Sequence, residues 1–498
     1  MSEKGMKGKE IFGHPRGLAV LFFTEMWERF SYYGMRGLLV LYLVDDIATG
    51  GFGWSQVEAL SLYGTYTMMV YLMGIPGGIL ADKYIGQKKA VMVGGALLVL
   101  GHGVMALPGE NIFYLALTLI VLGVGALKAN ISTMVGQLYR HGDPRRDKGF
   151  TIFYMGINVG SALSSLLVGY IGQVYGWHWG FGLAGLGMLI GQLQFMLGGK
   201  YLQGIGEFVK EDISTIPSGS VHFERLKKNP VSLVITILMF LVGAYVMIDT
   251  NILFGVLIMI ASIFIGFGIN IYKYELDDKE KDRIAVLLIS FLLVIAFFGA
   301  FEQAGGLMNL YTEQKTDKSV FGLFEMTAAQ FQFFNPIFII LFGLPVAYFW
   351  GVRRAKGKEE SAVFKMAIGN IIMGLGFVMM VGATQQVANG SLASMWWIVG
   401  AYLLHTIGEL SSSPVSLSFV TKLAPAKYGS IMMGLYFAIV GLGNKVAGLL
   451  GQSASQLGEM EVFAGIGFFS VLIGVLVILF LKKLKKLTHG AEETNLDT

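Results

Sequence analysis

Apolar runs of about twenty residues recur along almost the whole chain, and this repeat limits the possible fold more than any other feature. A helix of roughly twenty apolar residues is long enough to cross the hydrocarbon core of a bilayer. Of the 498 residues, 54% are hydrophobic and only 14% are charged, whereas a typical soluble domain is about 25% charged. The 68 glycines fit this class, because small residues let membrane helices pack closely. The pattern predicts an all-α polytopic membrane protein.

The apolar runs divide into six, then two, then six, which makes about fourteen spans at roughly twenty residues each. The first six lie near residues 16–44, 55–81, 89–107, 112–138, 148–174 and 180–200. The middle pair lies near 230–248 and 251–272, and the last six lie near 285–312, 327–351, 362–383, 394–420, 428–451 and 460–482. Two six-span halves are the expected build of a transporter whose site lies at their midplane interface.

The same division predicts four segments of chain. We expect an N-terminal six-helix bundle (1–200), a linker with two extra transmembrane helices (201–284), a C-terminal six-helix bundle (285–483) and a cytoplasmic tail (484–498). The two extra helices carry few charges inside their apolar runs. We therefore expect them to pack at the periphery rather than to line a pathway.

Basic residues predict the orientation of the spans. If fourteen spans alternate, the N-terminus, the basic loops and the C-terminal tail fall on one side of the membrane, with a minor exception at Lys315 and Lys318. Cytoplasmic loops carry the excess of Lys and Arg, so both termini are expected in the cytoplasm. The polar N-terminus lacks a short apolar core followed by a small-residue cleavage site, and we expect no cleaved signal peptide.

Composition also excludes several function classes. The net charge of +4 is small and calls for no nucleic-acid partner. The chain has no cysteine, which rules out disulfides and thiolate chemistry. His405 has no second histidine near it in sequence, so we favour a packing or hydrogen-bonding role and expect no metal or cofactor.

The first span contains four charges that are costly in a bilayer unless they face partners or water. Glu25, Arg29, Tyr32 and Arg36 follow i, i+4, i+7, i+11 spacing and therefore share one face of a helix, with Glu28 beside them. Intramembrane charges mark a substrate or ion pathway by default. This span is the strongest indication of function in the chain.

Three further spans each place a charge inside the membrane: Lys128 in span four, Glu302 in span seven and Glu409 in span ten. Arg36 and Glu302 both lie about 15 Å from the outer ends of their spans at about 1.5 Å per residue, so they can pair as an outer gate. Lys128 and Glu409 both lie near mid-membrane on opposite halves, where a substrate with a positive and a negative end would fit between them.

Each charge also has a structural interpretation, as part of a buried ion pair that fixes helix packing. For the set as a whole we favour function, because packing alone does not require matched depths in the two halves. Lys445 lies nearer the outer end of span eleven, and we assign it a mostly structural role.

Several motifs resemble the proton-dependent oligopeptide transporters (POT) of the major facilitator superfamily. The first-span sequence Glu25-x-x-Glu28-Arg29-Phe30-x-Tyr32-Tyr33 is similar to that family's first-helix signature, and 153–161 (FYMGINVGS) is similar to its fifth-helix signature. The 78–89 loop resembles the superfamily's loop motif. The segments 301–303 (FEQ), 335–336 (NP) and 408–414 (GELSSSP) also match in order, and the extra central pair is typical of bacterial members.

The resemblance implies a multi-pass protein of the bacterial cytoplasmic membrane with a major facilitator fold, which imports di- and tripeptides together with protons. By analogy, Arg29 and Lys128 hold the peptide carboxylate, while Glu409, Asn158 and Asn335 hold its amino terminus. The remaining assignments are Tyr32, Tyr33 and Tyr71 as pocket lining, Glu25, Glu28 and Glu302 as proton-coupling groups, and Arg36 with Glu302 as the outer gate.

Two positions depart from the family pattern. Animal members carry a histidine in the second helix, and alignment on Tyr71 places Gly64 there in this chain. Many bacterial members have a tryptophan after Met-Gly-x in the eleventh helix, and here Tyr436 follows Met433-Gly434-Leu435. We expect these changes to alter proton coupling and side-chain preference rather than the transport class.

We expect alternating access, in which protonation of a carboxylate weakens an ion pair and shifts the balance between outward-open and inward-open states. The closest alternative is a carrier of another small solute, such as nitrate or a drug, on the same fold. A membrane-embedded enzyme is disfavoured because no nucleophile arrangement or metal-ligand cluster is evident. A channel is disfavoured because charges paired between the halves suit a gated carrier better.

Overall fold

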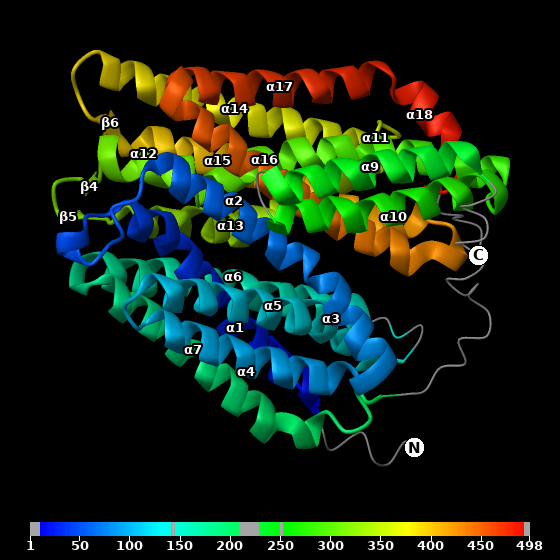
Figure 1. Ribbon diagram of the computed structural model, residues 1–498, viewed down its shortest axis with the longest axis horizontal. Coiled ribbons are helices and arrows are strands. Elements are labelled where there is room, and N and C mark those ends of the chain that lie inside the picture. Colours follow the sequence, from blue (N-terminus) through cyan, green and yellow to red (C-terminus); the bar gives the residue numbers. More distant parts are fainter. Residues whose placement is uncertain (1–9, 141–142, 144, 209–228, 250–251, 493–498) are drawn as a thin grey trace. The chain divides into compact units, whose positions relative to one another are not determined.

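The computed structural model describes residues 10–140, 143, 145–208, 229–249 and 252–492 (Figure 1). The chain forms two compact units. The larger comprises 1–209, 290–419 and 433–481, and the smaller comprises 210–289, 420–432 and 482–498. Segment 209–228, whose basic residues contribute to the predicted orientation, lies outside the described residues.

The first half of the chain forms a bundle of long helices in the larger unit. They are α1 (Arg16–Val44), α2 (Gln56–Leu72), α3 (Gly74–Leu80), α4 (Gln87–Met105), α5 (Glu110–Gln137), α6 (Arg146–Tyr175) and α7 (Trp177–Gly198). Helix α1 packs on α6 and α7, and α4 packs on α5 (Figure 1). Small residues make the α1–α6 contact close: a Cβ added at Gly160 would lie 2.1 Å from the backbone oxygen of Met26. Leu38, Phe181 and Met188 form part of the fully buried core.

The second half begins in the smaller unit and continues in the larger one. Its helices are α11 (Asp278–Phe301), α12 (Leu307–Lys315), α13 (Phe334–Ala355), α14 (Ala362–Ala388), α15 (Met395–Leu423), α16 (Gly429–Leu457), α17 (Glu459–Leu479) and α18 (Leu481–Leu487). Helix α14 packs on α17. Single-turn or slightly longer 3-10 and π segments link several helices: η2 (Ile47–Thr49), η3 (Ala81–Ile85), η4 (Gly199–Tyr201), η6 (Glu302–Ala304), η7 (Ala328–Phe333) and η8 (Ala426–Tyr428).

Short strands occur only in the connections of the described residues. The pair β1 (Glu10–Ile11) and β2 (His14–Pro15) is antiparallel, as is the pair β4 (Ser319–Val320) and β5 (Phe324–Glu325). Strand β3 (Thr316–Asp317) pairs in parallel with β6 (Ala393–Ser394), so two loops of the second half are joined by backbone hydrogen bonds.

The two extra helices, α9 (Pro230–Asp249) and α10 (Ile252–Tyr274), pack against each other in the smaller unit. Polar side chains join them: Asn229 Nδ2 donates to Asn270 Oδ1 at 3.0 Å, and Ser232 Oγ donates to the carbonyl of Gly266 at 2.8 Å. Such interhelical hydrogen bonds stabilise helix pairs in a medium without water.

Ten helices of the described residues are long and apolar enough to cross a membrane. Four further helices, α1, α2, α9 and α15, lie at expected span positions but fall short of that length or hydropathy. The charges of α1 lower its hydropathy, and α2 has only 17 residues. Together these helices account for the predicted six, two and six arrangement.

The second and seventh spans are interrupted. The sequence predicted one continuous helix for each of them. Helix α2 ends at Leu72 and α3 follows from Gly74, because Pro76 cannot donate a backbone hydrogen bond to the carbonyl of Leu72 and its ring crowds that turn. The seventh span breaks at η6, where Gly305 and Gly306 follow and Gly306 adopts φ −105° and ψ −112°. Glu302 therefore lies at the break and not inside a regular helix.

Candidate functional site

The charged face of α1 forms a compact buried cluster around Arg29. Arg29 Nε lies 3.2 Å from Glu25 Oε1 and also contacts Glu28 Oε2. The guanidinium lies over the rings of Tyr32 and Tyr33, at 5.1 and 5.6 Å from their centroids. Two carboxylates thus share one guanidinium. The cluster has one excess negative charge, which a bound proton would neutralise.

The same cluster retains unused polar atoms. Arg29 Nη2, Glu25 Oε2 and Glu28 Oε1 are buried and have no hydrogen-bond partner among the described residues. A buried unpaired donor on a guanidinium costs free energy unless a ligand or water occupies it. Arg29 is therefore able to donate a further hydrogen bond to an anionic group.

Lys128 on α5 supplies a second cation. Its Nζ lies 4.5 Å from the centroid of the Tyr71 ring on α2, and its nearest charged groups include Arg29, Glu28 and Glu25. No carboxylate of the described residues comes within ion-pair distance of Lys128. Lys128 is half-buried as a residue, and its ammonium can bind an incoming carboxylate.

Close contact between α3 and α5 helps to place these groups. A Cβ at Gly77 would lie 2.1 Å from the carbonyl oxygen of Gly125, and a Cβ at Gly125 would lie 2.5 Å from the carbonyl oxygen of Met73. Both positions therefore require glycine. The resulting approach holds the end of α2, with Tyr71, against the part of α5 that carries Lys128.

The second half contributes an acidic and amide cluster. Asn335 Nδ2 at the start of α13 donates to Glu409 Oε2 on α15 at 2.8 Å and also lies 3.1 Å from Thr406 Oγ1. Asn335 and Glu409 are half-buried. A carboxylate next to an amide oxygen is a suitable arrangement for an ammonium group.

These two clusters lie within electrostatic range of each other but do not touch. Tyr71 interacts electrostatically with both Arg29 and Glu409, and Tyr154 on α6 does so with Tyr33 and Glu409. Across the described residues, no hydrogen bond or ion pair joins Lys128 to Glu409. Asn158 donates instead to the carbonyl of Tyr154 on its own helix at 3.0 Å.

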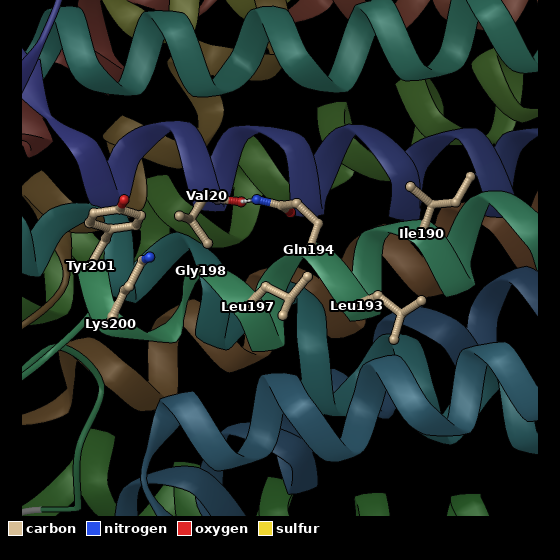
Figure 2. A pocket seen from close by; sticks show the side chains of 8 residues that line it. All are labelled: Val20, Ile190, Leu193, Gln194, Leu197, Gly198, Lys200 and Tyr201. Carbon is tan, nitrogen blue, oxygen red and sulfur yellow. Dashed lines mark hydrogen bonds between the residues drawn. The ribbon is translucent and has the colours of Figure 1, made fainter.

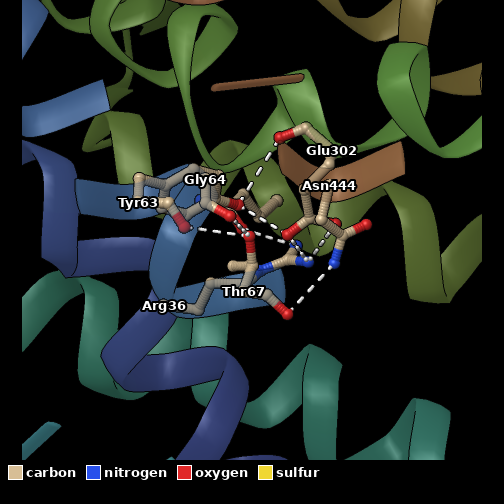
Figure 3. A network of polar contacts seen from close by, with 7 residues as sticks. Arg36, Tyr63, Gly64, Thr67, Glu302 and Asn444 are labelled. Carbon is tan, nitrogen blue, oxygen red and sulfur yellow. Dashed lines mark hydrogen bonds and ion pairs between the residues drawn. The ribbon is translucent and has the colours of Figure 1, made fainter. Parts of the chain in front are cut away.

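A third cluster joins the halves through Arg36 (Figure 3). Arg36 Nη1 lies 3.1 and 3.2 Å from the two oxygens of Glu302, and Nη2 donates to Gln332 Oε1 at 3.3 Å. Tyr63 on α2 donates its hydroxyl to Glu302 Oε1 at 2.7 Å. The guanidinium also lies 4.9 Å from the ring centroid of Tyr33, which connects this cluster to the one around Arg29.

Helices α2 and α16 cross next to this cluster at a pair of glycines. A Cβ at Gly64 would lie 2.8 Å from the Cα of Gly448, so neither position has room for a side chain. Asn444 Nδ2 lies 3.5 Å from the carbonyl of Thr67 (Figure 3), and Lys445 Nζ lies 3.0 Å from Thr65 Oγ1. Gly64, the position of the animal histidine in the alignment, is therefore a packing position here.

The contacts between the halves just described lie on the Val44 side of Arg29. A further hydrogen bond on that side joins Asn309 Nδ2 to the carbonyl of Gly37 at 2.8 Å. The two halves are therefore closed against each other at this end of the bundle.

Other positions singled out from sequence have defined surroundings. The ring of His405 lies 4.7 Å from that of Phe377 on α14. The hydroxyl of Tyr436 is 2.8 Å from Ser416 Oγ, so this phenol is occupied by α15. In the part of the chain that the structure describes, no group of histidine and acidic residues is arranged to hold a metal ion.

Sequence reasoning missed Tyr63, Gln332 and Thr406. Tyr63, Thr67 and Tyr71 follow i, i+4, i+8 spacing and share one face of α2, a signal that was available in the sequence. Gln332 lies in η7, a short non-α segment, so no helical periodicity marks it. Thr406 lies one turn before an acidic residue in an apolar run, which alone is a weak signal.

The chain is similar in sequence and in structure to known transporters. The model of the POT family matches residues 88–463. The chain is 37% identical to the peptide transporter YePEPT of Yersinia enterocolitica over 97% of each chain, and 32% identical to the di-/tripeptide transporter of Lactococcus lactis over 96% of this chain and 97% of that one. A crystal structure of a peptide transporter POT in complex with sulfate aligns with a TM-score of 0.84 at 32% identity, covering 98% of this chain and 99% of that one.

Proposed function

This chain belongs to the POT family, as its first-span and fifth-span motifs predicted, and we propose that it is a proton-coupled symporter that imports di- and tripeptides by alternating access. It is an all-α polytopic membrane transporter with the two six-helix halves and two extra helices of the major facilitator fold. One observation carries the substrate assignment. Lys128, a cation without an ion pair in the described residues, lies on one half, and the Glu409–Asn335 pair lies on the other.

In this proposal the peptide lies between the two halves with its termini in opposite clusters. The carboxylate of the peptide accepts from Lys128 and from the open Nη2 of Arg29, since an ammonium and a guanidinium both suit a carboxylate. The peptide ammonium binds Glu409 and the amide oxygen of Asn335. Tyr33 and Tyr71 line the space between the termini, and the ring of Tyr32 lies against the Arg29 guanidinium. Asn158 on α6 is the third group proposed for the peptide ammonium.

Proton coupling uses the excess carboxylate around Arg29. With Glu25 and Glu28 both charged, the single guanidinium is held by its own helix and is less available to a substrate. Protonation of one of them neutralises the excess and frees Arg29 for the peptide carboxylate. An inward proton gains about 2.3 kcal/mol per 100 mV of membrane potential.

The outer gate is the network of Arg36, Glu302, Tyr63 and Gln332. Its atoms come from both halves, so it exists only while the Val44 end of the bundle is closed. Protonation of Glu302 weakens its attraction for Arg36 and shifts the equilibrium toward the outward-open state. The ring of Tyr33 contacts both Arg29 and Arg36 and so joins the Arg29 cluster to the gate. Binding of a proton or substrate at Arg29 can therefore affect the gate through this one side chain.

We place the protein in the bacterial cytoplasmic membrane with both termini inside. The support is the basic excess of alternate loops. The proposed division is a six-helix bundle (1–200), the extra pair with its linker (201–284), a second bundle (285–483) and a tail (484–498). Peptides, protons and lipid are the partners, and transport proceeds without enzymatic turnover of the peptide.

The test is uptake of labelled dialanine into proteoliposomes under an imposed pH gradient and potential. Competitors are unlabelled dialanine, its amide, its N-acetyl derivative and nitrate. Dialanine should compete strongly and nitrate should not. Loss of one charge-assisted hydrogen bond, worth about 1.5–3 kcal/mol, predicts that the amide and the acetyl derivative each bind about 10-fold to 150-fold more weakly.

Variants then assign each terminus of the peptide. Lys128→Gln should remove most of the preference for the acid over the amide while keeping the preference for a free amine. Glu409→Gln should do the reverse. Lys445→Gln is the matched control, because this lysine of α16 donates to Thr65 Oγ1 and is assigned no role in holding the peptide, and its acid-to-amide ratio should be unchanged. Absence of dialanine uptake under both the pH gradient and the membrane potential would contradict the proposed function.

A further inference from the structure

An apolar groove of about 500 Å³ lies on the outside of the first-half bundle, between α1 and α7 (Figure 2). Ile190, Leu193 and Leu197 line it from α7 and are 41%, 49% and 79% exposed. Its floor is closed by Gln194, which accepts from Thr24 Oγ1 at 3.0 Å and donates to the carbonyl of Val20 at 3.3 Å. The polar groups of the floor are thus satisfied, and the groove presents hydrocarbon.

One end of the groove is basic. Figure 2 shows Lys200 and Tyr201 at that end and Ile190 at the other. Lys200 Nζ and the guanidinium of Arg16 lie 5.2 and 5.8 Å from the centroid of the Tyr201 ring, so two cations share one aromatic side chain. Within the described ranges neither cation has an ion-pair partner, and the buried Nε of Arg16 has no hydrogen-bond partner.

The length of the groove along α7 is informative. Ile190 and Lys200 are ten residues apart on α7 and its 3-10 extension, which corresponds to about 15 Å at about 1.5 Å per residue. The hydrocarbon core of a bilayer is about 30 Å thick. The groove is therefore about as long as one leaflet is deep, and we place its Lys200 end at the level of the headgroups.

We propose that this groove binds one anionic phospholipid of the cytoplasmic leaflet. Its phosphate lies between Arg16 and Lys200, and one acyl chain lies along Leu193 and Leu197. Charge complementarity selects the anionic headgroup, because cations next to an apolar groove recognise acidic lipid headgroups. A lipid held only by its acyl chain would show no headgroup preference.

Such a lipid would connect the N-terminal start of α1 to the C-terminal end of α7. Lys88, in the first turn of α4, donates to the carbonyls of Gly199 and Leu202 at 3.4 Å and already fixes that end of α7 from α4. Bound lipid therefore stabilises the Arg16 end of α1, the helix that carries the proposed substrate residue Arg29 and the proposed gate residue Arg36. This site is independent of the identity of the transported solute.

The experiment is native mass spectrometry of the full chain in detergent, titrated with phosphatidylglycerol or phosphatidylcholine. The wild type should bind one phosphatidylglycerol more tightly than phosphatidylcholine. Lys200→Gln and Arg16→Gln should each weaken phosphatidylglycerol binding about fivefold, the effect expected for one basic residue near an anionic surface. Leu193→Trp, which fills the groove, should weaken binding of both lipids.

Lys83→Gln is the matched control, because it removes an exposed lysine of η3, which is not among the residues that line the groove. It should leave the affinity unchanged. Equal binding of the two lipids by the wild type, or an undiminished preference in Lys200→Gln, would overturn the proposal. Displacement of the lipid by excess glycerol 3-phosphate would overturn the acyl-chain part, since it would indicate a headgroup site alone.

Discussion

Removal of the Tyr63 hydroxyl by Tyr63→Phe should weaken the outer gate without removing either charge of its ion pair. The hydroxyl donates to Glu302 Oε1 at 2.7 Å, and the same oxygen keeps Arg36 Nη1 at 3.1 Å in the variant. The carboxylate is therefore not orphaned, and the loss lies at the lower end of the range for hydrogen bonds to charged groups, about 1.5–2 kcal/mol. Since the bond joins the two halves, the closed-to-open ratio at the outer end should fall about 10-fold to 30-fold.

The absence of native cysteine makes this change measurable with introduced spin labels. Ala48→Cys, after α1, and Ala388→Cys, at the end of α14, place labels on exposed residues at the outer ends of the two halves. Double electron–electron resonance then gives the distance distribution between them. Tyr63→Phe should transfer population from the short to the long distance.

Tyr66→Phe provides the control on the same helix. The buried hydroxyl of Tyr66 has no hydrogen-bond partner among the described residues, so its removal should leave the distribution unchanged. The reasoning is refuted if Tyr63→Phe leaves the distances as in the wild type, or if both variants shift them equally.

Two further substitutions address the proton and the helix crossing. Glu28→Gln should abolish proton-driven accumulation of peptide while preserving exchange, because Arg29 then faces one carboxylate instead of two; full accumulation in this variant would exclude Glu28 from coupling. Gly64→Ala places a Cβ 2.8 Å from the Cα of Gly448, and overpacking of about 1–3 kcal/mol should separate α2 from α16 and lengthen the same spin-label distance. Gly103→Ala, where a Cβ meets nothing within 4 Å, should have no effect on that distance.

Much of the fold was predictable because a bilayer permits few solutions. With no water to bind backbone groups, apolar runs of sufficient length must be helices, and the expected middle pair at 230–248 and 251–272 matches α9 and α10 closely. The breaks in spans two and seven were not predicted. Hydropathy is insensitive to a proline or a glycine pair, although Pro76 and Gly305-Gly306 decide where those helices stop.

The break at η6 also has a consequence for the gate. A Cβ at Gly305 would lie 2.1 Å from the hydroxyl oxygen of Tyr63, so Tyr63 reaches Glu302 only because residue 305 is glycine. The sequence identified Arg36 and Glu302 from their depth. It gave no means of finding Gln332, because a contact between residues 36 and 332 depends on how two distant segments pack.

The sequence alone determined the helical membrane class, the family and the presence of charges inside the spans, because each follows from local composition, spacing and motif. The tertiary structure decided which charges are paired. Arg29 is shared by two carboxylates and Arg36 is bound to Glu302, whereas Lys128 has no acidic partner in the described residues. The physical reason is that an ion pair depends on distances of a few ångströms between side chains on different helices, and these distances arise only when the helices pack.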